Sequence, residues 1–125
     1  MSHLQYHIET FGCQMNIYDS ELIAGLLQNC GYSETSDIKH ADIIFLNTCA
    51  IREKAEDTVH NRLESIQYLK TRKPHVMIGV MGCMAQNLKD NLLESKPYVD
   101  IILGPDSYRR IPEIINSRKP HILNP

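Results

Sequence analysis

Three times along this chain, a short apolar segment ends close to a cysteine and is followed at once by a helical pattern of apolar residues. The cysteines are Cys13, Cys49 and Cys83, and the intervals between them are 36 and 34 residues. Intervals of this size are about the length of one strand–helix unit. Each cysteine therefore falls at the same place in its unit, after a strand. The repeat predicts parallel strands connected by helices, with three thiols brought to one edge of the sheet.

Four segments predict the strands, over 6–11, 43–46, 76–82 and 99–103; the last three are mainly apolar, and His7 and Glu9 interrupt the apolar pattern of the first. The polar stretch 33–40 predicts a loop. Together these units indicate an α/β fold, a doubly wound, flavodoxin-like parallel sheet of about four strands with flanking helices. In the expected 2-1-3-4 order, the 6–11 strand lies between the 43–46 and 76–82 strands.

Apolar residues at helical spacing follow each strand and predict helices that pack on the sheet. Cys30 continues the apolar stripe of the first helix and precedes Gly31, which is typical of a helix C-terminus. Packing therefore explains Cys30. The remaining stripes consist of Leu22, Ile23, Leu26 and Leu27, then Ala55, Val59, Leu63, Ile66 and Leu69, then Leu88, Leu92 and Leu93, and finally Ile111, Ile114 and Ile115.

The composition limits the class of protein. With 125 residues, the chain is expected to form one domain, and its 13 basic and 15 acidic residues give none of the positive charge expected of a phosphate-backbone binder. We see no signal peptide, and the longest apolar run, Val76–Ala85, has 10 residues and is too short to span a bilayer. We therefore expect a cytoplasmic protein without membrane contact, whose cysteines serve metal binding or catalysis.

A metal centre is one interpretation of the three cysteines at matched positions. Neighbouring strands lie about 4.8 Å apart, so three adjacent strand ends span roughly 10 Å. Gly12 and Gly82 would let the backbone approach an inorganic cluster, and the helix N-termini favour the thiolate. The alternative is that the cysteines are small packing residues.

The type of metal follows from the spacing. Zinc sites usually have four ligands with short-spaced pairs such as C-x2-C, which this chain lacks, although a histidine could complete one. An iron–sulfur cluster held by three cysteines leaves one iron open for chemistry. The histidines that remain open as ligands are His7, His40, His60 and His75.

A different class of function would use one cysteine as a nucleophile. A flavodoxin-like domain with Cys13 after its first strand would resemble a phosphocysteine carrier or a small phosphatase. The phosphatase pattern requires an arginine five residues after the cysteine, and position 18 is Tyr18. A carrier leaves Cys49 and Cys83 without a role. Near the cysteines, Gln14, Asn16 and Gln86 are candidates for hydrogen bonds to sulfur or a ligand, and helix capping explains Asn16 equally well.

Three stretches resemble the N-terminal domain of the radical-SAM methylthiotransferases. They are Thr-Phe-Gly-Cys-Gln-Met-Asn-Ile-Tyr-Asp-Ser-Glu at 10–21, Asn-Thr-Cys-Ala-Ile-Arg-Glu-Lys-Ala at 47–55 and Gly-Cys-Met-Ala-Gln at 82–86. The second stretch is similar to the branch that modifies tRNA, the 2-methylthio-N6-dimethylallyladenosine synthases. The branch that modifies a ribosomal protein usually has Gly-Phe after Asn-Thr-Cys, where this chain has Ala50-Ile51. That branch remains the alternative within the family.

This resemblance implies that residues 1–125 are the sulfur-donor domain of a larger enzyme. It implies that Cys13, Cys49 and Cys83 hold an auxiliary 4Fe-4S cluster whose open iron carries the inserted sulfur, and it assigns no catalytic residue here. The family's second 4Fe-4S cluster, its C-x3-C-x2-C motif and S-adenosylmethionine belong to a central domain. Neither that motif nor the family's RNA-binding domain is found in this sequence. We therefore expect the chain to be inactive alone, to pair with those domains, and to add little tRNA affinity.

Overall fold

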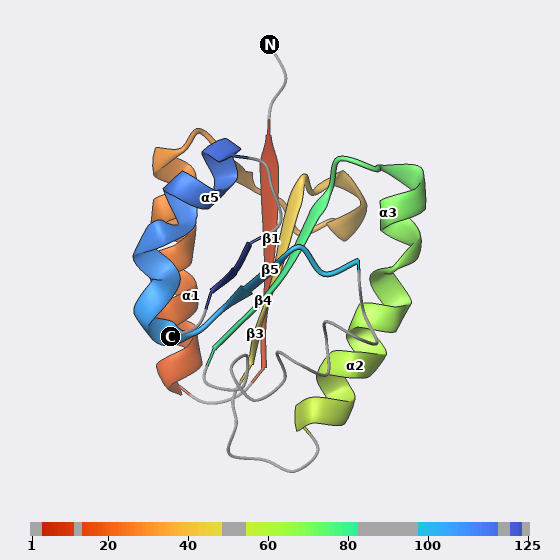
Figure 1. Cartoon of the computed structure of the whole chain (residues 1–125), viewed down its shortest axis with the longest axis horizontal. Helices are drawn as coiled ribbons and strands as arrows, with labels where there is room; N and C mark the ends of the chain where they lie inside the picture. Colours follow the sequence, from red (N-terminus) through yellow and green to blue (C-terminus); the bar gives the residue numbers. More distant parts are fainter. Residues whose placement is uncertain (1–3, 12–13, 49–54, 83–97, 118–120, 124–125) are drawn as a thin grey trace.

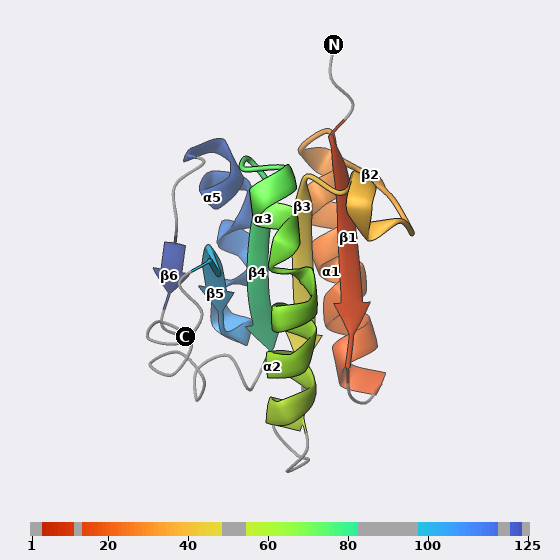
Figure 2. The ribbon, with the colours of Figure 1, turned by 90° about the vertical axis from the view of Figure 1, so that its right-hand side faces the viewer.

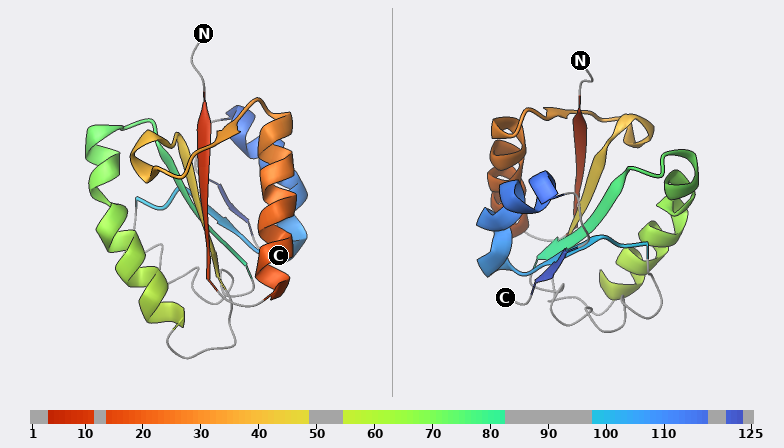
Figure 3. Two further views of the ribbon diagram at one scale, coloured as in Figure 1. Left: turned by 180° about the vertical axis from the view of Figure 1, so that it is seen from behind. Right: turned by 45° about the horizontal axis from the view of Figure 1, so that its top comes forward.

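The computed structural model describes residues 4–11, 14–48, 55–82, 98–117 and 121–123. In this part of the chain, helices cover both faces of one parallel sheet (Figure 1). Helices α1 (Gln14–Asn29) and α5 (Ile111–Ser117) lie on one face, and α2 (Ala55–Ile66) and α3 (Tyr68–Arg72) lie on the other (Figure 3). The predicted α/β class is therefore confirmed.

The sheet has the order β2-β1-β3-β4-β5-β6, and every neighbouring pair is parallel. Two 3-10 turns, Ile38–His40 and Pro105–Arg110, precede β3 and α5. The strands are β1 (Gln5–Thr10), β2 (Ser33–Glu34), β3 (Ile43–Thr48), β4 (Met77–Gly82), β5 (Ile101–Leu103) and β6 (His121–Leu123).

Three details of the predicted sheet are wrong. Ser33–Glu34 forms an edge strand where we expected a loop, and with His121–Leu123 the described residues contain two strands beyond the four expected. The 6–11 strand does not lie between the 43–46 and 76–82 strands: β3 lies between β1 and β4, and the 2-1-3-4 order is obtained only with Ser33–Glu34 as the second strand. The sequence did not predict β2 because this strand has only two residues, both polar and exposed, and no apolar pattern indicates a strand there.

Within the described residues, the core consists of two apolar clusters, one on each face of the sheet. All six residues of β3 are buried, and its four apolar residues alternate between the clusters, with Ile44 and Leu46 facing α2 and with Ile43 and Phe45 facing α1 and α5. A continuous apolar strand is what a sheet covered on both faces requires. Among the described residues, none of the helices combines the length and the apolar character needed to cross a bilayer.

Most of the predicted helix stripes are confirmed where the structure describes them. Ile23 and Leu27 of α1 are buried, but Leu22 is 40% exposed. The single helix expected after Cys49 is divided at Gln67 into α2 and α3. Its buried residues are Val59, Leu63, Ile66 and Leu69, while the stripe at Leu88, Leu92 and Leu93 lies outside the described residues.

Two lysines connect α3 and the turn that follows it to the amino-terminal edge of the sheet. Lys70 forms an ion pair with Asp100, whose carboxylate also accepts a hydrogen bond from the Ile78 amide. Lys73 donates to the Ala41 carbonyl oxygen over 2.9 Å and lies 3.8 Å from Asp42. These two lysines therefore hold α3 and the following turn against the sheet. They do so at the edge opposite the strand ends that precede the cysteines.

Candidate functional site

The carboxyl ends of β1, β3 and β4 meet at one edge of the sheet. Thr10 pairs with Asn47, and Thr48 pairs with Gly82, so β3 forms the centre of this edge (Figure 2). The Phe11 amide continues the ladder by donating to the Asn47 carbonyl oxygen over 2.8 Å. The strands that precede the three cysteines are thus adjacent, parallel and in register.

Cys13, Cys49 and Cys83 themselves lie outside the described residues. Cys49 follows Thr48 directly and Cys83 follows Gly82, so the structure brings together the residues before them. Convergence of the three thiols remains a prediction. Cys30 is described: it is a partly buried free thiol packed against the apolar cluster beneath α1 and α5, as its position in the helical stripe predicted.

Two buried asparagines join α1 to the end of β3. The Asn16 side-chain Nδ2 donates to Asn47 Oδ1 over 3.0 Å and to the Thr48 carbonyl oxygen over 2.8 Å. In return, Asn47 Nδ2 donates to the Asn16 carbonyl oxygen over 2.7 Å and to Ser20 Oγ over 2.8 Å. We call these two side chains the asparagine pair. Asn16 lies within α1 and bonds across to β3, which is a more specific role than the helix cap considered from sequence.

Hydroxyl groups extend this arrangement along the edge. Thr10 Oγ1 and Ser20 Oγ lie 2.7 Å apart and share a hydrogen bond, which links the end of β1 to α1. Thr48 Oγ1 donates to the Met81 carbonyl oxygen over 3.2 Å, which links β3 to β4. The polar contacts therefore reach all three strands that precede a cysteine.

Gly82 ends β4 in a conformation that favours glycine. Its φ is 113°, and a Cβ at this position would lie 2.2 Å from the Thr48 carbonyl oxygen. From sequence we expected a glycine here to let the backbone approach an inorganic cluster. In the described residues, the close approach that requires it is to Thr48 of the neighbouring strand.

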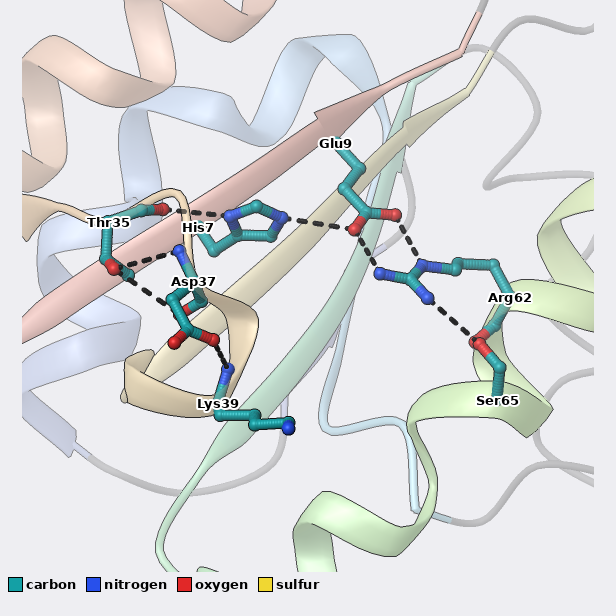
Figure 4. Close-up of polar contacts among 7 residues, drawn as sticks. All are labelled: His7, Glu9, Thr35, Asp37, Lys39, Arg62 and Ser65. Carbon is teal, nitrogen blue, oxygen red and sulfur yellow. Dashed lines mark hydrogen bonds and ion pairs between the residues drawn. The ribbon is translucent and has the colours of Figure 1, made fainter.

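Several histidines that remained open as metal ligands are bonded elsewhere. His7 lies between the Thr35 carbonyl oxygen, 2.9 Å from Nδ1, and the Glu9 carboxylate, 3.1 Å from Nε2 (Figure 4). His75 contacts Asp42 at 3.2 Å, and His40 lies 3.6 Å from Asp37. Within the described part of the chain, no group of three His, Cys, Asp or Glu side chains could hold a metal ion.

His7 belongs to a polar chain that crosses from β1 to α2. Arg62 Nε donates to Glu9 Oε1 over 2.7 Å, and Arg62 also donates to Ser65 (Figure 4). Burial raises the pKa of Glu9, but the hydrogen bonds from Arg62 and His7 outweigh it and hold that pKa below its ordinary value of 4.5. Both nitrogens of the His7 ring therefore have an oxygen partner, the Thr35 carbonyl and the Glu9 carboxylate.

A shallow, open groove of about 200 Å³ lies beside the asparagine pair, between α1, β1 and β2. Thr10, Ser20, Glu21 and Glu34 are among the residues that line it. The two carboxylates would repel an anionic ligand in this groove. Cys13 lies outside the described residues, so the phosphocysteine carrier considered from sequence is not tested by this groove.

We did not predict from the sequence that Asn47 belongs to this edge, although its position at the end of an apolar run indicated a specific role. Asn47 and Thr48 are polar residues at the end of an otherwise apolar run, and both are completely buried. Buried polar side chains must find hydrogen-bond partners, so such residues indicate a specific polar contact. Which partner they find depends on residues 31 positions earlier in the chain.

The chain is similar to larger proteins that modify tRNA. It is 49% identical over 110 residues to a protein of Bacteroides fragilis, and 50% identical over 109 residues to one of Amoebophilus asiaticus, both named tRNA-2-methylthio-N(6)-dimethylallyladenosine synthase. It is 48% identical over 113 residues to the human mitochondrial tRNA methylthiotransferase CDK5RAP1. These alignments cover 88%, 87% and 87% of this chain but only 24%, 22% and 19% of the respective relatives.

The resemblance to the methylthiotransferases is therefore confirmed, and the chain spans about a quarter or less of the length of these curated relatives. A protein-family model described as Uncharacterized protein family UPF0004 matches residues 5–104. The match includes every strand from β1 to β5 and the whole edge at which β1, β3 and β4 end. The chain belongs to the UPF0004 family.

Proposed function

We propose that this chain is the sulfur-donor domain of a tRNA methylthiotransferase and that Cys13, Cys49 and Cys83 hold a 4Fe-4S cluster. The observation that carries the proposal is the adjacency of the ends of β1, β3 and β4 in one parallel sheet. Each of the three strands leads directly into a segment with one cysteine. The similarity to proteins named as tRNA methylthiotransferases supports the same assignment.

The edge fits a compact cluster in size and in chemistry. Three strand ends about 4.8 Å apart span roughly 10 Å, a distance that cysteine side chains bridge around one inorganic core. Thiolates are the usual ligands of iron–sulfur clusters. Helix α1 begins at Gln14, directly after Cys13, and the positive end of a helix favours the ionised thiol. When bound, the cluster would supply the sulfur that the enzyme inserts.

The substrate in this proposal is tRNA, and the change is 2-methylthiolation of N6-isopentenyl-adenosine next to the anticodon. The run at 47–55 and the names of the relatives support the tRNA branch over the ribosomal-protein branch. The net charge of −2 leaves this chain little attraction for a phosphate backbone. An RNA-binding domain of the parent enzyme would therefore provide most of the affinity for tRNA.

The reaction also requires parts that this sequence does not contain. We assign S-adenosylmethionine and a second 4Fe-4S cluster to a radical-SAM domain of the parent enzyme, which acts in the cytoplasm. Carbon 2 of adenine is unactivated, so its hydrogen must be removed before sulfur is attached. The 125-residue chain alone is accordingly expected to bind its cluster and to be catalytically inactive.

Iron and sulfide analysis after anaerobic reconstitution tests the cluster assignment. Cys13→Ala, Cys49→Ala and Cys83→Ala should each lose most of the bound iron, because one of three protein ligands is removed. Cys30→Ala is the matched control and should keep its iron, since this thiol packs against apolar residues beneath α1 and α5. Equal iron loss in all four variants, or no iron in the wild type, would refute the assignment.

Nucleoside analysis of tRNA tests the substrate. A strain without the parent gene, and without a redundant enzyme, should lack 2-methylthio-N6-isopentenyl-adenosine and accumulate the unmodified N6-isopentenyl form. Persistence of the methylthio nucleoside would contradict the tRNA assignment. Loss of methylthiolation from a ribosomal protein in the same strain would support the sister branch instead.

A further inference from the structure

We propose that Asn16 and Asn47 are positioning residues that set the separation of the cysteine-bearing segments. This inference rests on the proposed cluster site. It assigns a role to two buried amides that hold no metal themselves, Asn16 three residues after Cys13 and Asn47 two residues before Cys49.

The asparagine pair is closed by directional hydrogen bonds. A side-chain amide has two N–H donors, and both donors of each asparagine are used, two by Asn16 and two by Asn47. All four bonds run between the first two turns of α1 and the end of β3. Asn47 is fully buried and Asn16 is 4% exposed, so water does not compete for these groups. The pair therefore favours this arrangement of α1 against β3 over others that would leave buried donors without partners.

The pair acts on segments that each contain a cysteine. Asn16 follows Cys13 by three residues, and its Nδ2 binds the carbonyl of Thr48, the residue before Cys49. Thr48 in turn donates to the Met81 carbonyl oxygen and lies against Gly82, the residue before Cys83. One connected set of contacts thus begins in the first helix and reaches the ends of β3 and β4.

Amides suit this role better than apolar residues would. A buried hydrogen-bond pair adds little net stability over a well-packed apolar pair, but a misplaced donor has a large cost. The pair therefore specifies orientation more than it adds stability. Groups that hydrogen-bond to metal ligands and orient them typically change metal affinity by about 10- to 100-fold when they are removed, and this range sets the scale for the pair.

Asparagine-to-aspartate substitutions test the pair with almost no change in shape. In Asn47→Asp, an oxygen replaces the amide nitrogen and faces the Asn16 carbonyl oxygen. In Asn16→Asp, the new oxygen faces the Thr48 carbonyl oxygen. Both changes turn attractive contacts into repulsive ones. Asn61→Asp, on the exposed surface of α2, is the chemical control, and Leu63→Ala, in the core beneath α2, is the control for general destabilisation.

The measurements are iron content, the rate of iron release to a chelator, and the electron paramagnetic resonance spectrum of the reduced chain after anaerobic reconstitution. Asn47→Asp and Asn16→Asp should release iron about tenfold faster or more, with a broadened or shifted spectrum. Asn61→Asp and Leu63→Ala should keep the wild-type spectrum and release rate. Circular dichroism verifies that each variant is folded.

A milder variant keeps the test decisive if the aspartates do not fold. Ser20→Ala removes one acceptor of Asn47 Nδ2 and leaves the amide pair itself intact. It should produce a smaller increase in release rate with the same spectral trend. Wild-type spectra and rates in Ser20→Ala and in the folded aspartate variants would overturn the inference. An equal increase in Leu63→Ala would overturn it too, because the effect would then be general destabilisation.

These outcomes are separable from those of the proposed function. If the cysteine variants lose iron while the asparagine variants behave like the wild type, only the positioning role fails. If the wild type binds no iron, or if the cysteine variants keep it, the cluster site itself fails.

Discussion

At Gly82 the backbone has a φ of 113°, and an added Cβ would lie 2.2 Å from the Thr48 carbonyl oxygen. Gly31 also has a positive φ, 93°, but open space surrounds the position of its Cβ. A side chain at Gly31 would therefore meet only backbone strain, whereas a side chain at Gly82 would meet both backbone strain and steric overlap. Of these two glycines, only Gly82 lies at the sheet edge that precedes the cysteines.

We expect Gly31→Ala to reduce the free energy of unfolding by about 1–3 kcal/mol, the usual cost of a strained backbone conformation. Gly82→Ala should reduce it by clearly more, because the contact with the Thr48 carbonyl adds to the strain. Urea denaturation of the iron-free chain measures both losses. Similar losses for the two variants would show that the overlap is relieved at little cost.

At the scale of an element, α1 combines several demands. Its buried residues Ile23 and Leu27 pack on the sheet, and Asn16 and Ser20 bind to Asn47 near its amino-terminal end. Gly25 lies in the middle of the helix on the exposed side, where a Cβ would meet nothing within 4 Å. Glycine in such a position weakens the helix without serving a contact there.

Gly25→Ala should therefore stabilise the chain by about 0.5–1 kcal/mol, because alanine loses less conformational entropy in a helix. Thermal and urea denaturation measure the gain. The iron content after reconstitution should be unchanged, since the substitution is remote from the asparagine pair. A loss of stability would show that α1 tolerates no side chain at this position.

The contact between β1 and α2 gives a pH dependence. The pKa of Glu9 is lowered in the folded chain, so folding favours its ionised form. The resulting stability is complete above the unfolded-state pKa of about 4.5 and is lost as the pH falls through the folded-state value. Glu9→Gln should therefore be less stable than the wild type near pH 7, and the difference should shrink in acid.

Urea denaturation between pH 7 and pH 3 tests this expectation. Glu21→Gln, on the exposed face of α1, serves as the control. A constant difference between wild type and Glu9→Gln across this range would contradict the role assigned to the Arg62 and His7 contacts.

At the scale of the whole molecule, the two ends of the parallel strands carry different sets of contacts. The amino-terminal edge contains the Lys70–Asp100 pair and the Asp42 contacts, which connect the sheet to α3 and to the turn after it. At the carboxyl edge, β1, β3 and β4 end near buried amides and a strained glycine. The division follows from parallel topology, because only the carboxyl ends of the strands lead into the cysteine segments.

If the cluster binds at the carboxyl edge, it should stabilise the whole domain, because a ligand that binds only the folded state shifts the folding equilibrium. The anaerobically reconstituted chain should melt at a higher temperature than the same chain after chelation. Cys49→Ala should show no such difference. Equal melting temperatures for loaded and chelated wild type would place the iron on a site that is not coupled to folding.

The sequence by itself determined the parallel α/β class, the buried stripes of α1 and α2, and the common edge for β1, β3 and β4. These features depend on periodicity and on the fixed place of each cysteine in its strand–helix unit, which are local properties. The convergence of the thiols is a prediction of the same kind and is still to be tested. Only the tertiary structure decided that β3 lies at the centre, because β2 is defined by its pairing with β1 and not by its own residues. The Asn16–Asn47 pair and the Glu9–Arg62 contact likewise join residues 31 and 53 positions apart, and no local pattern specifies which distant side chain satisfies a buried polar group.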